Sequence, residues 1–183
     1  MKKNPKKLTI LPTNQLLQQV WDYLISRPSK KGEYKKSQME CLYLLGWKVG
    51  LRISEALSFD LSLEHGENQY KNLYLLRGKG KKERWVYVSE EITKELKRRN
   101  WKANQTNRFT FSKFLEQVKK ELNISNQIEL SPHTLRRCFA TYNAISGMPL
   151  AVLQKVLGHS KVSTTALYVK DGDLSNLVKF RPI

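Results

Sequence analysis

The sequence is poor in cysteine, in acidic residues and in long apolar runs, and each shortage excludes a class of protein. Its two cysteines, Cys41 and Cys138, form no CxxC pair and lack the histidine spacing of a zinc site, so no metal is expected. No apolar run approaches the roughly 20 residues that span a bilayer, and no lipidation motif is present. The lysine-rich N-terminus lacks the apolar stretch of a secretory signal. We therefore expect a cytoplasmic protein with no membrane partner.

Acidic residues are the scarcer charged group: 16 Asp and Glu stand against 33 Lys and Arg, and the formal net charge is +17. Such an excess predicts a polyanionic partner. Nucleic acid is the commonest one, because each phosphate that a basic side chain neutralises releases condensed counterions and so drives association.

The length of 183 residues, with 40% hydrophobic and 27% charged residues, predicts one folded domain. Residues 1–12 are basic and contain two prolines, so we expect a flexible arm that ends where Thr13 caps the first helix, at 13–26. Apolar residues at helical spacing predict the inner face of that helix: Leu16, Leu17, Val20, Trp21, Leu24 and Ile25.

Further helices are expected from the same periodicity at 37–49, 52–58, 90–99, 110–122, 132–146 and 149–157. Ser131 and Pro132 suit a helix start, and Gly147 and Gly158 suit helix ends. Aromatic and β-branched residues predict strands at 72–77 and 84–88, joined by a hairpin with a basic tip. The fold class expected is α+β, mainly α-helical with a small antiparallel β-sheet.

Three stretches carry residues suited to phosphoryl transfer: residues 50–57, the hairpin around Lys79, and residues 133–168. His133 and Arg136 stand three residues apart on one expected helix, so both side chains can reach the same point beyond that face. Arg52 stands at the start of its own helix, where the backbone dipole and the guanidinium both favour an anion.

These groups fit a reaction in which a protein hydroxyl attacks phosphorus. A phenol with a pKa near 10 is ionised to only about one part in a thousand at pH 7, so it needs a proton acceptor and stabilisation of the charge that builds on phosphorus. Two arginines supply that stabilisation by forked hydrogen bonds to the non-bridging oxygens, without a metal. From the hairpin, Lys79 would reach into a groove beside the phosphate and protonate the departing 5′ oxygen.

The sequence resembles the tyrosine recombinase family, which includes phage integrases and bacterial Xer-type recombinases, over about residues 13–170. The family's first motif matches Gly50-Leu51-Arg52-Ile53-Ser54-Glu55, and its hairpin matches Gly78-Lys79-Gly80-Lys81-Lys82-Glu83-Arg84. Its second motif matches Ser131-Pro132-His133-Thr134-Leu135-Arg136. Its third matches Leu157-Gly158-His159-Ser160, followed after nine residues from His159 by Tyr168.

The resemblance implies a definite set of roles. Arg52 and Arg136 would clamp the scissile phosphate, and Glu55 would help to order the site. Lys79 would act as general acid, His133 would assist proton transfer from the nucleophile, and His159 would donate to a phosphate oxygen. Tyr168 would form the 3′-phosphotyrosyl bond, which conserves the energy of the broken bond. No nucleotide cofactor is then needed, and neither GxxxxGK[ST] nor GxGxxG is completed in the sequence.

Several alternatives stay open at this point. Tyr168 is one of eight tyrosines, and without the family spacing it is not distinguished from Tyr142. Lys79 competes with Lys81 and Lys82 for the role of general acid. We expect further DNA contacts at Lys81, Lys82, Arg84 and Arg137. The enzyme expected is a site-specific recombinase or integrase acting on double-stranded DNA, and the alternatives are a type IB topoisomerase-like activity and a non-catalytic DNA-binding regulator that retains the fold.

The sequence departs from the family pattern at two places. Arg137 follows the second arginine where the family commonly has a histidine. Most relatives carry an extra N-terminal helical domain that closes the other side of the DNA, and we expect this clamp either to be absent or to be supplied by another protein. Residues 171–183 are expected to be a C-terminal tail that docks on a neighbouring protomer or folds back. We expect self-association on DNA as a dimer or tetramer, or pairing with a partner recombinase, and location at the nucleoid when bound.

Overall fold

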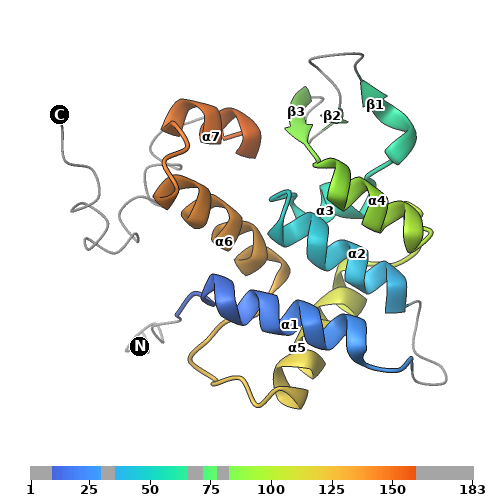
Figure 1. The fold of residues 1–183 in the computed structure, drawn as a ribbon, viewed down its shortest axis with the longest axis vertical. Helices are drawn as coiled ribbons and strands as arrows, with labels where there is room; N and C mark the ends of the chain where they lie inside the picture. Colours follow the sequence, from blue (N-terminus) through green and yellow to red (C-terminus); the bar gives the residue numbers. More distant parts are fainter. Residues whose placement is uncertain (1–9, 30–35, 66–71, 78–82, 160–183) are drawn as a thin grey trace, which may run out of the picture.

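The computed structural model describes residues 10–29, 36–65, 72–77 and 83–159 (Figure 1). Its helices are α1 (Asn14–Ser26), α2 (Lys36–Trp47), α3 (Ile53–Leu57), α4 (Glu90–Arg98), α5 (Arg108–Glu121), α6 (Pro132–Ile145) and α7 (Leu150–Leu157), with a 3-10 turn η1 (Leu61–Leu63). Its strands are β1 (Glu64–His65), β2 (Leu73–Arg77) and β3 (Glu83–Tyr87). The expected α+β class, mainly helical with a small antiparallel sheet, is confirmed.

Helix α2 forms the centre of the core. Its residues 38–47 are all buried, and α1, α3, α4, α5 and α6 pack against it. A helix that is buried on every side has no polar face to present, which explains why its apolar residues lie all around it. In Figure 1 the sheet and α7 lie at one end of the molecule, and α1 and α5 lie at the other. The end with the sheet and α7 is the one that carries the candidate site.

The sheet has the order β1-β2-β3, with antiparallel pairing throughout. The expected hairpin between β2 and β3 is confirmed, while its tip, residues 78–82, lies outside the described residues. Strand β1 was not predicted because two residues are too few to show an alternating pattern. Tyr74, Leu76 and Val86 are buried on the inner face of the sheet. Strand β3 packs against α7, and so connects the sheet to the end of that helix.

The helix ends follow the sequence signals. The Thr13 side chain accepts a hydrogen bond from the Leu16 backbone N–H, and Ser131 caps α6 in the same way, with Pro132 at its first position. Helix α7 ends at Gly158, whose φ of 61° lies in the left-handed region. These caps confirm the predicted ends of three helices, and they fix the point at which the chain leaves α7.

Two details of the N-terminal region were predicted wrongly. Ile25 on α1 is 46% exposed instead of facing the core. The folded part also begins before Thr13, because the Ile10 N–H donates to the Gln127 carbonyl at 2.8 Å and the Ile10 carbonyl accepts from the Glu129 N–H at 3.3 Å. Residues 10–12 therefore belong to the packed domain and not to an arm, while residues 1–9 lie outside the described residues.

Candidate active site

The C-terminal end of α7 is held by arginines from other elements. A helix leaves its last carbonyl groups without partners inside the helix, and these oxygens carry the negative end of the helix dipole. Each of three successive carbonyls accepts a hydrogen bond from one arginine: Val156 from Arg84, Leu157 from Arg136 and Gly158 from Arg52. The arginines come from β3, α6 and the start of α3, so this helix end is where the three elements meet.

The Glu55 carboxylate lies between the same three arginines. Its Oε1 accepts from Arg52 Nη1 at 2.8 Å, its Oε2 accepts from Arg84 Nη2 at 2.7 Å, and Arg136 Nη1 lies 3.6 Å from Oε2. The Arg52 backbone N–H also donates to Oε2 at 2.7 Å. Burial would raise the pKa of Glu55, but the hydrogen bonds and charge of Arg84, followed by those of Arg52, outweigh it and lower the pKa. Glu55 is therefore a carboxylate at neutral pH.

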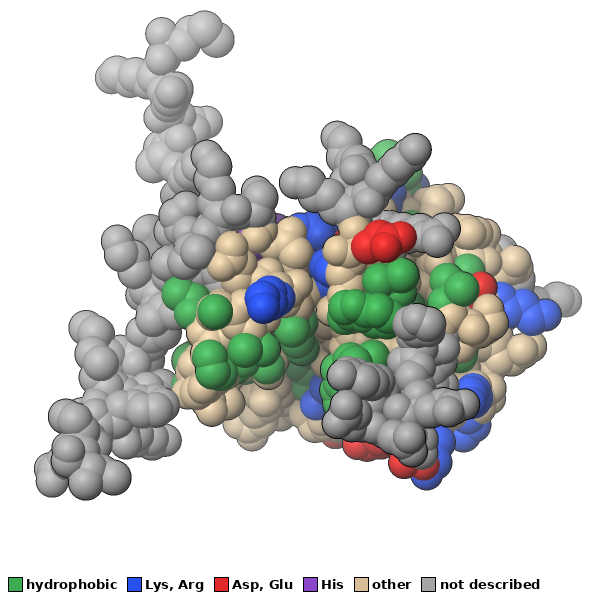
Figure 2. Space-filling view, turned by 90° about the horizontal axis from the view of Figure 1, so that it is seen from above, with side chains coloured by type: hydrophobic (Ala, Val, Ile, Leu, Met, Phe, Trp, Pro, Cys, Tyr) green, Lys and Arg blue, Asp and Glu red, His purple; other side chains and the backbone are tan. Residues whose placement is uncertain are grey.

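Arg52 and Arg136 differ in their access to solvent. The Arg52 side chain is 42% exposed, whereas that of Arg136 is 4% exposed and donates to the Gly50 carbonyl at 2.9 Å. Gly50 has a φ of 73°, and a Cβ there would lie 2.3 Å from Phe139 Cδ1, so only glycine fits. Arg136 is thus fixed from inside, and Arg52 faces outward beside it. Figure 2 shows basic side chains and a histidine on this face, between two larger hydrophobic areas.

His159 follows Gly158 and lies against Arg136. Its backbone N–H donates to the Gln154 carbonyl at 3.1 Å, and its Nε2 lies 3.4 Å from Arg136 Nη2. Burial, and then the positive charges of Arg136, Arg52 and Arg84, lower the pKa of His159 to about 4. The ring is therefore neutral at pH 7, so one of its two nitrogens carries a proton that it can donate and the other can accept.

The remaining predicted catalytic residues are not all brought together by the described part. His133 lies exposed on the first turn of α6, three residues before Arg136, and forms no hydrogen bond or ion pair with another described residue. Lys79, Tyr168, Lys81 and Lys82 lie outside the described residues. The structure thus assembles Arg52, Glu55, Arg136 and His159, which are four of the seven catalytic and accessory residues expected.

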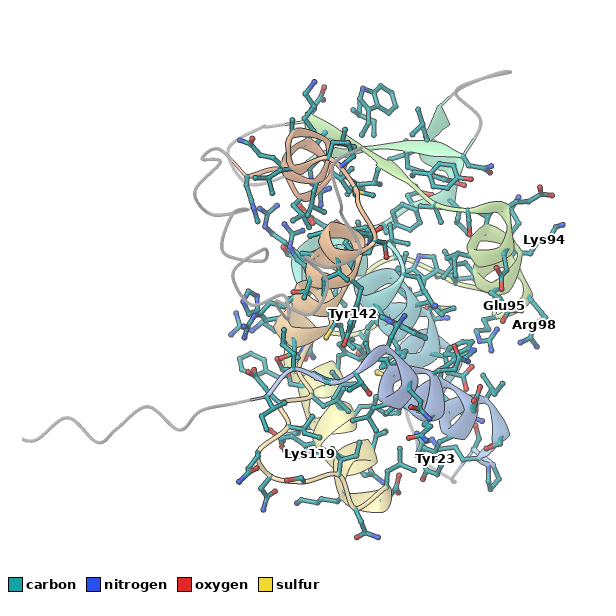
Figure 3. All side chains as sticks on the ribbon, turned by 60° about the vertical axis from the view of Figure 1, so that its left-hand side comes forward. Tyr23, Lys94, Glu95, Arg98, Lys119 and Tyr142 are labelled. Carbon is teal, nitrogen blue, oxygen red and sulfur yellow. The ribbon has the colours of Figure 1, made fainter. Side chains whose placement is uncertain are left out.

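Tyr142, the rival to Tyr168 in the sequence, is used in packing. Its hydroxyl donates to the Pro12 carbonyl at 2.7 Å, and Figure 3 shows it on α6 near the segment that leads into α1. Burial raises the pKa of its hydroxyl, with a smaller contribution from Cys138, which makes the phenolate harder to form. Tyr142 therefore lacks both the freedom and the acidity that a nucleophile needs.

Arg84 lies elsewhere than the sequence suggested. Its side chain is 10% exposed, and its two terminal nitrogens donate to Glu55 and to the Val156 carbonyl, so the predicted DNA contact is corrected to an internal one. A signal for this was present in the strand pattern. Arg84 alternates with Val86 and Val88, which are buried, and so falls on the inner face of the sheet. Arg137 is half-buried on α6.

Neither a metal cluster nor a membrane span is found in the part of the chain that the structure describes. There, no group of three His, Cys, Asp or Glu side chains could hold a metal ion. Among the helices described, none has the length and apolarity to cross a bilayer.

Comparison with known proteins places this arrangement in a family. The model of the phage integrase family matches residues 14–174. The chain belongs to the phage integrase family. The resemblance inferred from the motifs is thereby confirmed, and the match covers Arg52, Arg136, His159 and Tyr168.

Members of the family with curated names include tyrosine recombinases of the Xer type. The chain is 30% identical to tyrosine recombinase XerD of Halalkalibacterium halodurans over 186 aligned positions, covering 90% of this chain and 59% of the relative. It is 32% identical to XerD of Oceanobacillus iheyensis with the same coverage, 90% and 59%. The chain thus spans about three fifths of the length of these relatives.

Solved structures show the same fold at lower identity. The XerH site-specific recombinase, in a post-cleavage complex with its palindromic difH substrate, matches with a TM-score of 0.74 and 19% identity, over 95% of this chain and 54% of that one. The catalytic domain of bacteriophage HP1 integrase matches with a TM-score of 0.66 and 20% identity, over 96% of each chain. The catalytic domain of HP1 integrase and this chain thus match each other over nearly their whole lengths.

Proposed function

We propose that this chain cleaves and rejoins double-stranded DNA through a covalent 3′-phosphotyrosyl bond to Tyr168, in site-specific recombination or integration. The observation that carries the proposal is the meeting of Arg52 and Arg136 with His159 at the end of α7. The two arginines are far apart in sequence and share the Glu55 carboxylate, and His159 stands nine residues before Tyr168. The resemblance to the family to which the chain belongs implies that these groups bind a phosphodiester.

The described residues supply electrostatic stabilisation. Arg52 is open to solvent and Arg136 is held behind it, so both guanidinium groups can contribute to binding the non-bridging oxygens of one phosphate. Neutral His159 donates a hydrogen bond to an oxygen of that phosphate. The charge that grows on phosphorus in the transition state is met by fixed positive charge, with no reorganisation at the moment of reaction.

The roles of the residues in the covalent step are proposed from the family resemblance. The Tyr168 oxygen attacks phosphorus as the phosphorus–O5′ bond breaks, the tyrosine proton passes to His133, and Lys79 gives a proton to the leaving 5′ oxygen. Attack by a free 5′ hydroxyl on the phosphotyrosine reverses these transfers and rejoins a strand. Because the bond energy is kept in the phosphotyrosine, no nucleotide cofactor is consumed.

Double-stranded DNA is the proposed substrate and partner. The net charge of +17 supports it, and XerH, which shares the fold, was solved with its difH substrate. We propose self-association on DNA, as a dimer or tetramer or with a partner recombinase, because complete recombination exchanges more than one strand. Action in the cytoplasm, at the nucleoid, follows from the same substrate.

A nicked suicide substrate tests the chemistry. The wild-type chain, incubated with a broad set of nicked duplexes from host DNA, is expected to form a protein–DNA adduct that survives denaturation. Tyr168→Phe should form none, while the matched control Tyr142→Phe should form it normally, since its hydroxyl bonds Pro12. An adduct with Tyr168→Phe would refute the assignment of the nucleophile. No wild-type adduct on any duplex would favour a non-catalytic DNA-binding regulator.

A further inference from the structure

Of the three arginines that the described residues place at the end of α7, Arg84 is the one that neither the motif roles nor the proposed chemistry uses. It is the second residue of β3, pairs with Leu76 across the hairpin, and has a side chain that is 10% exposed. A buried guanidinium loses hydration, so its position must be supported by hydrogen bonds that replace water. Two such bonds are present, to Glu55 and to the Val156 carbonyl, and they point to different elements.

The first bond places Arg84 on the carboxylate that orients Arg52. Arg84 donates to Glu55 Oε2 at 2.7 Å and Arg52 donates to Oε1 at 2.8 Å, so the carboxylate holds one arginine with each oxygen. A carboxylate that is gripped on both oxygens has no freedom to rotate. Loss of Arg84 would leave Oε2 with the Arg52 backbone N–H and the more distant Arg136 guanidinium, and so would weaken the hold on Glu55 and on the Arg52 side chain.

The second bond places Arg84 on the helix end that carries His159. Val156 lies three residues before His159, and the intervening Gly158 allows close contact. A Cβ on Gly158 would lie 2.5 Å from Arg84 Cδ, so the arginine stem crosses directly over the glycine. The Arg84 side chain therefore contacts the turn that sets the direction of His159, in addition to holding the helix.

We infer that Arg84 is a positioning residue of the site, whose guanidinium fixes the end of α7, and so His159, in register with Glu55 and Arg52. This inference rests on the proposed DNA cleavage. Arg84 acts through these neighbours, because its two terminal nitrogens donate to Glu55 and to the Val156 carbonyl, which hold Arg52 and the end of α7. The fork of an arginine suits this task, since it directs two donors along different lines at once, which a lysine ammonium on the same stem cannot reproduce.

The test separates positioning from DNA contact by measuring rate and affinity apart. With a nicked duplex that the wild-type chain converts to adduct, Arg84→Met is expected to slow adduct formation at saturating DNA by about 10²-fold, the loss that a displacement of about 1 Å causes. DNA affinity and its salt dependence should stay unchanged, whereas a lost phosphate contact would reduce the salt slope by about one. Arg84→Lys should also be slow.

A matched control and a second readout complete the experiment. Arg98→Met removes an arginine whose side chain is 65% exposed on α4, and it should change neither rate nor affinity. The His159 ring signal, followed by NMR, should move in Arg84→Lys as well as in Arg84→Met, because the lysine keeps the charge and any change there reports displacement. If Arg84→Met lowers the melting temperature too far, Arg84→Lys carries the test.

Each outcome decides one of the two proposals. The inference on Arg84 is overturned by a wild-type rate in both variants, by an unmoved His159 signal, or by weaker binding with a lower salt slope at an unchanged saturated rate. Absence of adduct with the wild-type chain overturns the proposed cleavage instead, and the His159 signal still reports whether Arg84 holds the end of α7.

Discussion

Two of the arginine clusters in the described residues, one around Arg99 and one around Glu55, are built in opposite ways. In one, Arg99 forms ion pairs with two carboxylates, with Glu40 at 2.7 Å and with Glu95 of α4. Its guanidinium also lies 4.8 Å from the centre of the Trp21 ring. In the other, one carboxylate, Glu55, is shared by Arg52, Arg84 and Arg136 at the end of α7. The first surrounds an arginine with acids, and the second surrounds an acid with arginines.

The difference shows which cluster is complete within the described residues. The Arg99 cluster joins α1, α2 and α4, and its buried arginine is neutralised by two carboxylates, those of Glu40 and Glu95. The Glu55 cluster holds more positive than negative charge and has one exposed arginine, and a phosphate would supply the missing negative charge. Changes in the first cluster should therefore affect folding alone, whereas changes in the second should affect chemistry, and stability too where they remove Glu55.

The largest effect expected is on stability, from the Arg99 cluster. Arg99→Met leaves buried Glu40 with Lys36, 3.5 Å away, as its remaining cationic partner, and loss of one member of a buried pair costs up to about 3–5 kcal/mol of unfolding free energy. Chemical denaturation measures this. Arg98→Met on the same helix, at the exposed end of a pair with Glu95 (Figure 3), should cost only about 0–1 kcal/mol. The rate of adduct formation by the folded fraction of Arg99→Met should match that of the wild type. A slower rate would contradict the assignment of a purely structural role to the Arg99 cluster.

The next effect is on rate, from the Glu55 cluster. Arg52→Ala removes an exposed guanidinium that the proposal places on the phosphate, and adduct formation should slow by about 10²–10³, as for loss of one oxyanion donor. Stability should change little because the side chain is 42% exposed. Quench-flow or gel assays of adduct against time provide the rate, with Arg98→Ala as the control. A variant that unfolds easily but reacts at the normal rate would contradict the role.

The elements and caps of the domain were readable from the sequence, while the inside of the site was only partly so. Periodicity located α1 to α7, and Ser131, Pro132 and Gly158 marked helix ends, because these signals are local. The family spacing located Arg52, Arg136 and His159. Exposure was harder to predict, since Arg84 was assigned to the surface and Ile25 to the core. Which guanidinium turns inward depends on where Glu55 and the end of α7 come together, and that is a tertiary fact.

A smaller effect depends on pH, through the same carboxylate. The pKa of Glu55 is lowered in the folded state, so between its folded and unfolded values the unfolded chain binds more protons and stability rises with pH. Glu55→Gln should cost about 1.5–3 kcal/mol of unfolding free energy at pH 7, since it replaces charge-assisted hydrogen bonds. This gap should be full above about pH 4.3, the ordinary glutamate value, and shrink as the pH falls through the folded value. Urea unfolding of both chains across pH 3–7 measures it, and a gap that does not change with pH would contradict the ionised state.

The smallest effect is a shift in one titration, and it tests whether the Glu55 cluster lacks negative charge. Burial and then the charges of Arg136, Arg52 and Arg84 lower the pKa of His159 to about 4, so its ring should stay neutral from pH 8 down to about 5.5 in the free protein. Inorganic phosphate bound beside Arg52 would offset those charges and raise the pKa. NMR of the histidine rings, with His159→Gln for assignment, follows the midpoint with and without phosphate. Arg99→Met should leave it unchanged, because that arginine belongs to the other cluster. A free-protein midpoint near the ordinary 6.5 would show that the positive charges of the arginines do not act on His159. The two clusters would then differ in how their side chains are arranged, but the Glu55 cluster would not have the excess positive charge that a phosphate is proposed to neutralise.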